Sequence, residues 1–503
     1  MKKVILIAFY FNQVNEIASK RLRALAKYLP QYGWEPIVIV PDLGDDPSIN
    51  ENMDCRIITT AYEDMFSHFL SKIKPSKENK IIEDDLKNQT EDSKLQEGSN
   101  GSEGSDSQKL MDSSSVSNPF VSKAISIAGE IFAYPDGMKY WYDSAFEIVS
   151  QIVEDEKIDA IISSSWPITC HTIAKDISDK YDIPWIADLR DLWNLNPYVS
   201  HTFIRDYFER RLELKTFENT DVLTTTTDLA ARTLSTLHPN NKIVPILSGY
   251  DKDDFKFLES IIDEIDNSSV DCEAVGKIDN SSVDCEAVGG IDNSSVDSNN
   301  STIVDDLRNK NNDSDKKNKL KFIYAGSLYG GKRDPTYLFK AIRQLEDESK
   351  IDSSRISIEF YGDSGNLEEI ARSFNLLDIV KIGGKIPHEE VLKKQLESDI
   401  LLLISWNNEK EKMFIPGKIY EYFALRKPVL SIGYKEGSLK ELIDETKVGY
   451  HVSDLESTKE VLLDLYTGYF EKGKVELNSD INIEDYSMET MASKFAELLN
   501  EII

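Results

Sequence analysis

The sequence predicts an α/β protein built from two doubly wound parallel sheets. Strand-length apolar runs alternate with stretches of helical periodicity, and the alternation occurs twice along the 503 residues. The runs are apolar throughout instead of at every second position, as expected for parallel strands covered by helices on both faces. In such domains ligands bind beyond the carboxyl ends of the strands. We therefore expect one site formed by the loops at those ends.

The strands are expected in two series, and helical spacing such as Ile173, Ala174 and Ile177 fills most gaps between them. The first series comprises 4–11, 36–40, 56–59, 160–162, 185–187, 222–224 and 243–247. The second comprises 322–324, 356–361, 380–382, 400–404 and 429–432. A last segment, 486–503, is predicted to be an amphipathic helix that packs on either domain.

Two polar segments interrupt this pattern and divide the chain. The first domain is predicted at 1–255, with a disordered insertion at 76–118 rich in Ser, Gly and acidic residues. Residues 256–318 contain "IDNSSVDCEAVGK" followed by "IDNSSVDCEAVGG", a period too short and too polar to bury a face. This stretch is predicted to be a disordered linker without a binding role. The second domain is predicted at 319–485.

Composition excludes several classes of protein. Acidic residues outnumber basic ones by 89 to 58, a net charge of −31, so nucleic acid is not expected as a partner. The four cysteines form no CxxC pair and no cluster with histidine, which predicts neither a disulfide framework nor a zinc site. No signal peptide and no apolar run of transmembrane length are visible. The expected location is a reducing cytoplasm.

A glycine-rich stretch at the start of the second domain reads "YAGSLYGGKRDP". Gly326, Gly331 and Lys332 match the phosphate loop of nucleotide triphosphatases, but Arg333 stands where that loop needs a Ser or Thr hydroxyl for Mg²⁺. The following helix is expected to start only near Pro335, after the glycines. Two interpretations remain: a turn whose N–H groups and cations surround a diphosphate, or a plain strand-to-helix turn.

Four stretches taken in order resemble the retaining GT-B glycosyltransferases of family 4 (group 1). They are "RLRALAKYLPQYGWEPIVIVP", "SSWPITCHTIAKDISDKYDIPWIADLRDLWN", "YAGSLYGGKRDP" and "GGKIPHEEVLKKQLESDILLLISWNNEKEKMFIPGKIYEYFALRKPVLSI". The second, with its ADLRDLW signature, is the most specific, and the last belongs to a PGK-YEY branch. Together they span both domains except the polar insertions. The resemblance implies a GT-B fold, with two Rossmann-like domains facing a cleft.

The resemblance also implies that a nucleotide-diphosphate sugar binds in the cleft, held mainly by the second domain. Lys332 falls where the family has its diphosphate lysine, and Lys418 or Arg333 adds charge. Glu421 matches the glutamate that binds the ribose hydroxyls; without the motif it reads as an exposed helix residue. Gly362, Lys385 and Ile386 fall where main chain holds the base. The implied donor site comprises Gly326, Ser327, Lys332, Arg333, Gly362, Lys385, Ile386, Pro416, Gly417, Lys418 and Glu421.

The first domain is expected to supply the acceptor side. Asp188, Arg190 and Asp191 follow a strand that is expected to be buried, where charges are costly unless they are paired or used. They form either a structural network or a catalytic group facing the sugar or acceptor hydroxyl, and His171 is a further catalytic candidate. The departing phosphate can take the acceptor's proton, so neither a metal site nor a cofactor is expected.

Three positions depart from the family pattern. The loop after the first strand reads "FYFNQVNEIASKR" and lacks the family's glycines. Met413 stands where many members have a second glutamate, and Ser327 replaces an arginine. These departures keep two other functions open: a non-catalytic sugar-nucleotide-binding protein and a GT-B epimerase or phosphorylase. The favoured function is transfer of a sugar, with retention, to a glycan or lipid-linked acceptor in cell-surface polysaccharide or glycolipid synthesis.

A basic stripe marks the first predicted helix. Lys20, Arg23 and Lys27 recur at helical spacing, with Arg21 beside them. The stripe is either a solvated face or a contact with anionic lipid at the inner face of the membrane.

Overall fold

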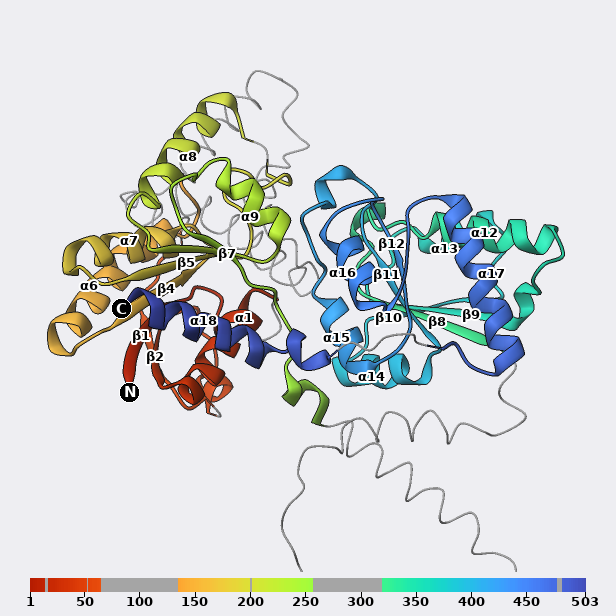
Figure 1. Cartoon of the computed structure of the whole chain (residues 1–503), viewed down its shortest axis with the longest axis horizontal. Coiled ribbons are helices and arrows are strands. Elements are labelled where there is room, and N and C mark those ends of the chain that lie inside the picture. Colours follow the sequence, from red (N-terminus) through yellow and green to blue (C-terminus); the bar gives the residue numbers. More distant parts are fainter. Residues whose placement is uncertain (14–16, 52, 65–133, 200, 257–318, 477–481) are drawn as a thin grey trace, which may run out of the picture.

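A computed structural model of the chain describes residues 1–13, 17–51, 53–64, 134–199, 201–256, 319–476 and 482–503. These residues form two α/β domains, each built around one parallel sheet with helices on both faces (Figure 1). The architecture confirms the predicted fold class. The predicted disordered segments, 76–118 and 256–318, lie outside the described residues, apart from Lys256.

The N-terminal domain contains a seven-stranded sheet with the order β3-β2-β1-β4-β5-β6-β7. Its strands are β1 (Lys2–Ile7), β2 (Trp34–Pro41), β3 (Arg56–Thr60), β4 (Ala160–Ser164), β5 (Trp185–Leu189), β6 (Val222–Thr225) and β7 (Ile243–Pro245). Its helices are α1 (Ile17–Tyr28), α6 (Tyr142–Asp155), α7 (Thr169–Tyr181), α8 (Phe203–Thr216) and α9 (Asp228–Ser235).

The C-terminal domain contains a six-stranded sheet with the order β10-β9-β8-β11-β12-β13. Its strands are β8 (Leu320–Ala325), β9 (Ile356–Tyr361), β10 (Val380–Gly384), β11 (Ile400–Ile404), β12 (Val429–Ile432) and β13 (Gly449–Val452). Its helices are α12 (Thr336–Asp347), α13 (Leu367–Ser373), α14 (His388–Glu397), α15 (Lys418–Leu425), α16 (Ser438–Thr446) and α17 (Leu455–Lys472).

Both sheets reverse their strand order at one point, between β1 and β4 and between β8 and β11. The helices that follow the two strands at such a point leave on opposite faces, which opens a crevice at the carboxyl ends. The loops after β8 and β11 therefore lie at the expected ligand position of the C-terminal domain.

Burial explains why the strands read as unbroken apolar runs. In β1, Val4 and Leu6 pack with α1 on one face, while Ile5 and Ile7 pack with α6 and α7 on the other. Every predicted run contains a strand, but β13 was not predicted. Its sequence, GYHV, is polar, and as the edge strand it buries only Val452 fully.

The final helix, α18 (Met488–Ile502), packs on the N-terminal domain although it follows the C-terminal one (Figure 1). Its apolar side contains Met488, Met491, Phe495 and Leu499, and it lies against α1. The returning chain runs beside the outgoing one, with Met488 N–H donating to the Tyr250 carbonyl at 2.9 Å. A Cβ added to Gly249 would lie 2.4 Å from the main chain of Ser487, so this crossing requires glycine.

Candidate functional site

The site begins at the carboxyl end of β8, where the chain turns at Gly326. This residue has a φ of +145°, and an added Cβ would lie 1.8 Å from Nζ of Lys418. Gly326 thus serves two purposes: it adopts a conformation that other residues avoid, and it leaves room for an ammonium group. Two segments that are remote in sequence, and that were both predicted to bind the donor, meet here.

The ammonium group of Lys418 is buried without a hydrogen-bond partner in the described part of the chain. Its Nζ exposes less than 1 Å², although other atoms of the residue reach the surface. It lies 4.7 Å from the ring centroid of Tyr324. Burial and, to a smaller extent, the nearby Arg333 lower the pKa of Lys418 to about 7, against the opposing effect of Glu421. A buried amine without a partner is costly, so this group is a strong candidate for binding an anionic ligand.

Arg333 and Lys332 point to different surroundings. Arg333 is half-buried, stacks on the Tyr329 ring at 4.2 Å and lies close enough to Lys418 to lower the pKa of that lysine. Lys332 is exposed, with its Nζ 5.2 Å from the centroid of Trp406 and 5.8 Å from that of Tyr198. Arg333 is therefore the cation beside Lys418, whereas the resemblance gave that place to Lys332.

Main-chain contacts hold the glycine loops of the C-terminal domain together. Gly326 N–H donates to the Tyr361 carbonyl and Gly362 N–H donates to the Gly384 carbonyl, both at 2.7 Å. A Cβ on Gly362 would lie 2.6 Å from the Gly326 carbonyl oxygen, so the two loops touch. Ser327 adds to this contact, since its Oγ donates to Asp363 of the loop after β9 at 3.2 Å and accepts from the Tyr329 N–H of its own turn at 3.1 Å.

Lys385 and Ile386 follow at the end of β10, the edge strand on that side of the sheet. Lys385 is exposed, and Ile386 packs partly against the apolar core under α14 and α15. Their main chain lies at the carboxyl end of the sheet, as Gly326 and Gly362 do. A segment that holds a base is expected at this end.

The N-terminus of α15 supplies the second half of the site. Gly417 is the N-cap and is exposed, with open space around its α-carbon, and Pro416 precedes it. The first N–H groups of a helix lack intrahelical partners and favour anions. Lys418 and Glu421 lie one turn apart at this end, so they share a face of the helix.

Glu421 connects the two domains. Its side chain is mostly buried, and Oε1 lies 3.3 Å from Nζ of Lys20 in α1. Lys20 also lies 3.8 Å from Asp254, and burial lowers its pKa, but the two carboxylates outweigh burial and raise it overall. The second carboxylate oxygen of Glu421 remains available to accept from a vicinal diol.

Two of the four catalytic candidates, Asp188 and His171, lie in the core of the N-terminal domain. Asp188 is fully buried and accepts from Arg21 at 3.0 and 3.1 Å, from Thr224 at 2.8 Å and from Ser164 at 2.9 Å. This is a structural network, but its arginine is Arg21 and not Arg190. A substrate cannot reach a carboxylate enclosed in this way.

His171 is also fully buried. Its Nδ1 lies 2.8 Å from Ser163 Oγ, and its ring packs against Phe217 and Trp185. Burial lowers the pKa of His171 to about 3, so the ring is neutral at physiological pH. The structure gives the predicted catalytic role no support, because the histidine is enclosed in the core beside β4.

Arg190 and Asp191 remain at the carboxyl end of β5, near the surface. Their side chains are 11% and 21% exposed, and Arg190 Nη2 lies 3.6 Å from Asp191 Oδ2. The same loop continues to Tyr198, which crosses to the C-terminal domain, packs on Trp406 and Phe414, and donates to Glu411. Burial and this hydrogen bond raise the pKa of Tyr198. The sequence pattern missed this contact because an aromatic residue in a loop gives no sign of its partner domain.

The cations of the basic stripe of α1 have partners within the protein, and membrane contact through this stripe stays a prediction. Arg21 is 2% exposed, and Lys20 is paired with Glu421. Arg23 donates to Asn50 at 2.8 Å, and Lys27 lies 2.6 Å from Asp251. Lys20, Arg23 and Lys27 lie on one side of the helix and meet acidic and polar partners remote in sequence, whereas Arg21 points into the core.

At two of the positions that depart from the family pattern, the side chains of this protein make packing contacts. The glycine-free loop after β1 buries Phe9 and Phe11, and Phe9 contacts Tyr62 and Trp141 edge to face. Met413 packs against the apolar core of the N-terminal domain, and its carbonyl accepts from Thr227 at 2.9 Å. The loop after β1 thus packs within the N-terminal domain, whereas Met413 contributes an apolar contact between the domains.

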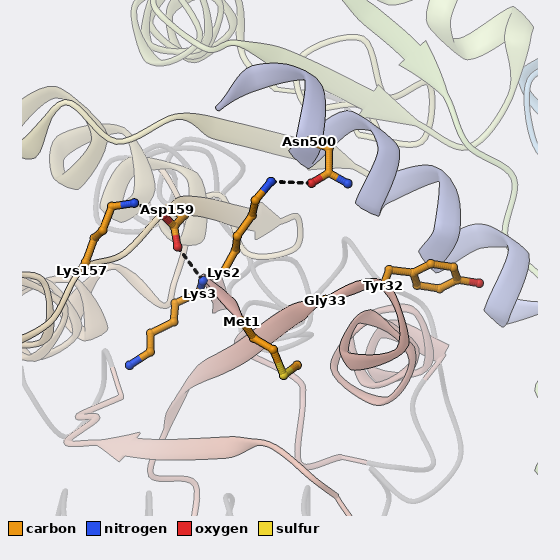
Figure 2. A pocket seen from close by; sticks show the side chains of 8 residues that line it. All are labelled: Met1, Lys2, Lys3, Tyr32, Gly33, Lys157, Asp159 and Asn500. Carbon is orange, nitrogen blue, oxygen red and sulfur yellow. Dashed lines mark hydrogen bonds and ion pairs between the residues drawn. The ribbon is translucent and has the colours of Figure 1, made fainter.

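A cavity of about 680 Å³ lies elsewhere (Figure 2). Its lining belongs to the amino ends of β1, β2 and β4 and to α18: Met1, Lys2, Lys3, Tyr32, Gly33, Lys157, Asp159 and Asn500. Lys2 donates to Asn500 at 2.9 Å and Lys3 N–H donates to Asp159 at 2.8 Å, so its polar groups pair with one another. Ligands of doubly wound domains bind at the other end of the strands.

No protein-family model matches the sequence, and no curated protein was found to match it. Solved structures do match over the whole chain. Sucrose-phosphate synthase from Thermosynechococcus elongatus has a TM-score of 0.52 at 12% identity, covering 100% of this chain and 99% of its own. Anabaena HepE in complex with UDP-glucose has a TM-score of 0.52 at 11% identity, with both chains fully covered. The lipopolysaccharide outer core galactosyltransferase WaaB has a TM-score of 0.50 at 10% identity, covering 99% and 100%. With its two Rossmann-like domains and these neighbours, the chain has the GT-B fold.

Proposed function

We propose that the protein is a glycosyltransferase that moves a sugar from a nucleotide-diphosphate donor to a glycan or lipid-linked acceptor. The observation that carries this proposal is the ammonium group of Lys418, buried without a hydrogen-bond partner in the described residues, against Gly326 and near Arg333. Two cations without a carboxylate between them, at a helix N-terminus, fit the oxygens of a diphosphate. HepE, which shares the fold, has been captured with UDP and with UDP-glucose, which supports this choice of ligand.

The remaining donor contacts are made by residues near the carboxyl end of the same sheet. Glu421 binds the ribose hydroxyls, because a carboxylate can accept both hydrogen bonds of a vicinal diol. The main chain at Gly362, Lys385 and Ile386 holds the base. Lys332 lies at the rim over Trp406 and Tyr198, where it attracts the anionic donor from solvent.

The chemistry follows from the leaving group. Breaking the sugar–phosphate bond builds negative charge on the departing diphosphate, and Lys418, Arg333 and the tip of α15 stabilise that charge in the transition state. Two such groups at ~3 kcal/mol each supply a rate factor of ~10⁴. The departing phosphate takes the acceptor's proton, so the sugar is transferred with retention and without a metal ion.

Arg190 and Asp191 are proposed to face the acceptor, because they are the partly exposed charged residues beyond β5. Their position in the N-terminal domain complements the donor groups of the C-terminal one. Cell-surface polysaccharide or glycolipid synthesis is the process in which such an acceptor is expected. A second candidate function is sugar-nucleotide binding without turnover, favoured by the apolar packing of Met413 and of the loop after β1.

Replacing Glu421 with Gln tests the donor site. The variant is expected to bind nucleotide sugars about 10- to 100-fold more weakly, since hydrogen bonds to a charged group contribute about 1.5–3 kcal/mol. Binding is measured by calorimetry over a panel of nucleotide sugars, and release of nucleoside diphosphate is followed with and without lipid extract. Glu441→Gln, an exposed acid on α16, is the matched control and is expected to behave like the wild type.

The outcomes separate the candidates. Release of nucleoside diphosphate that depends on Glu421 supports the transferase. Tight binding without release supports the non-catalytic protein. Binding that is equal in the Glu421 and Glu441 variants would place the nucleotide elsewhere and refute the proposed site.

A further inference from the structure

Helix α8 buries two glutamates while it exposes several large apolar side chains. Glu209 and Glu213 are completely buried. Glu209 accepts from Trp193 Nε1 at 2.6 Å and pairs with Arg205 at 2.9 Å, and Glu213 accepts from the main chain of Asn194 at 2.9 Å. These contacts fix the orientation of the helix, because rotating it would leave two buried carboxylates without their partners.

The opposite side of α8 exposes large apolar side chains to solvent. Phe203 is 87% exposed and Ile204 is 69% exposed, while Tyr207 and Phe208 are each more than half exposed. Leu214 continues this side two turns beyond Tyr207, and we call these five residues the aromatic face of α8. Contiguous exposed apolar side chains on an otherwise polar surface mark a binding surface.

Cations accompany the aromatic face. Arg210, Arg211 and Lys215 are exposed on the same helix, and the one exposed acid, Asp206, is held by Asn194 at 3.0 Å. This balance is opposite to that of the whole chain, which carries a net charge of −31. At physiological ionic strength charges beyond about 8 Å are largely screened, so the local cations determine what the helix attracts.

We propose that the aromatic face of α8 docks on the surface of an anionic lipid bilayer. A helix of 14 residues is about 21 Å long and can lie in the interface plane, with its aromatic side chains among the acyl chains and its cations at the head groups. Anionic lipid is favoured over a second copy of this chain because in a two-fold contact Arg210, Arg211 and Lys215 would face the same three cations of the other copy and repel them. The docking does not depend on the proposed enzymatic activity.

The location of α8 gives this docking a purpose if the proposed function is right. The helix begins just after the loop that carries Arg190, Asp191 and Tyr198, and Trp193 of that loop binds its buried side. A bilayer against α8 therefore lies on the acceptor domain, where a lipid-linked acceptor would be presented.

Flotation of the full chain with vesicles tests the proposal. The wild type is expected to float with vesicles of phosphatidylcholine and phosphatidylglycerol, and less with phosphatidylcholine alone. The triple variant Phe203→Ser, Ile204→Ser, Phe208→Ser is expected to bind at least tenfold more weakly. The matched control removes exposed apolar side chains of the C-terminal domain, Tyr337→Ser, Leu377→Ser and Tyr450→Ser, and is expected to float like the wild type.

Neutralising the cations gives a second, independent readout. Changing Arg210, Arg211 and Lys215 to Gln is expected to weaken binding to the anionic vesicles by about fivefold for each residue, and to leave binding to neutral vesicles unchanged. Thermal unfolding checks that each variant is folded, which is expected because the altered side chains are exposed. A wild type that does not float, or a triple variant that floats equally well, overturns the proposal. So does a triple variant whose only change is loss of a dimer in gel filtration.

Discussion

Replacing Arg21 with Met is expected to lower the free energy of unfolding of the protein by about 3–5 kcal/mol, the cost of leaving a buried charge uncompensated. Arg21 is 2% exposed and forms two hydrogen bonds with the buried Asp188. It also donates to the carbonyls of Ile246 and Leu247 and lies 5.1 Å from the ring centroid of Phe495. One side chain thus joins α1, the end of β5, the segment leaving the domain and α18.

Denaturant unfolding of Arg21→Met measures this effect, with Lys27→Met on the same helix as the control. Lys27 pairs with Asp251 in a partly exposed setting, where an ion pair contributes about 1 kcal/mol or less. The double variant Arg21→Met, Asp188→Leu removes both charges and is expected to recover part of the loss. Equal destabilisation by Arg21→Met and Lys27→Met would contradict the central role of the buried pair.

The pH dependence of this pair follows from Asp188. Burial raises its pKa, but Arg21, Thr224 and Ser164 outweigh burial and leave the pKa lowered from 3.8. A carboxyl group with a lowered pKa contributes stability that is fully present above its unfolded value and is lost as pH falls through the folded value. The difference between wild type and Arg21→Met is therefore expected to be constant from about pH 5 to pH 8.

Replacing Lys418 with Met is expected to have the opposite effect on stability and to abolish donor binding. The apolar side chain removes a buried amine that has no hydrogen-bond partner among the described residues, which stabilises the fold by about 1–3 kcal/mol. For a domain of this size that corresponds to about 2–4 °C in Tm for each kcal/mol. The diphosphate loses its buried cation, so binding of nucleotide sugars is expected to fall by at least 100-fold.

Both effects depend on pH in a defined direction. The pKa of Lys418 falls from 10.5 to about 7, so between these values the unfolded chain binds one more proton and stability rises with pH. The increase in Tm of Lys418→Met over the wild type is accordingly expected to be largest below pH 7. Donor binding favours the charged amine, so wild-type affinity is expected to fall by up to tenfold per pH unit above about 7, and Lys418→Met is expected to lack this slope.

Calorimetric titration of a nucleotide sugar between pH 6 and pH 9, together with thermal unfolding, checks this pair of expectations. Lys394→Met, a partly exposed lysine of α14 that lies over Tyr361, is the control and is expected to change neither property appreciably. A Lys418→Met variant that is less stable than wild type, or that binds as well, would show that the amine has a structural partner instead of a ligand.

Lys418 also illustrates why sequence identified part of the site and not its arrangement. The PGK-YEY motif placed Lys418 and Glu421 on one face of a helix tip, and the glycine loop placed Gly326 beside a strand end. Neither pattern states that Nζ of Lys418 rests against Gly326, because that contact depends on how α15 packs over β8. For the same reason the resemblance favoured Lys332 over Arg333, since adjacent residues differ in direction only once the loop is folded.

The sequence by itself determined the two sheets, the order of their strands along the chain and the loops that carry the donor site. These features depend on local periodicity and on apolar runs, which are properties of neighbouring residues. Tertiary structure decided which polar residues are buried and which charges are paired. Asp188 and His171 lie in the core, and cations of α1 face acidic partners. Tertiary structure also decided that α18 packs on the first domain. It also turned the aromatic face of α8 outward. Such outcomes depend on contacts between residues that are remote along the chain, and a local pattern contains no information about those partners.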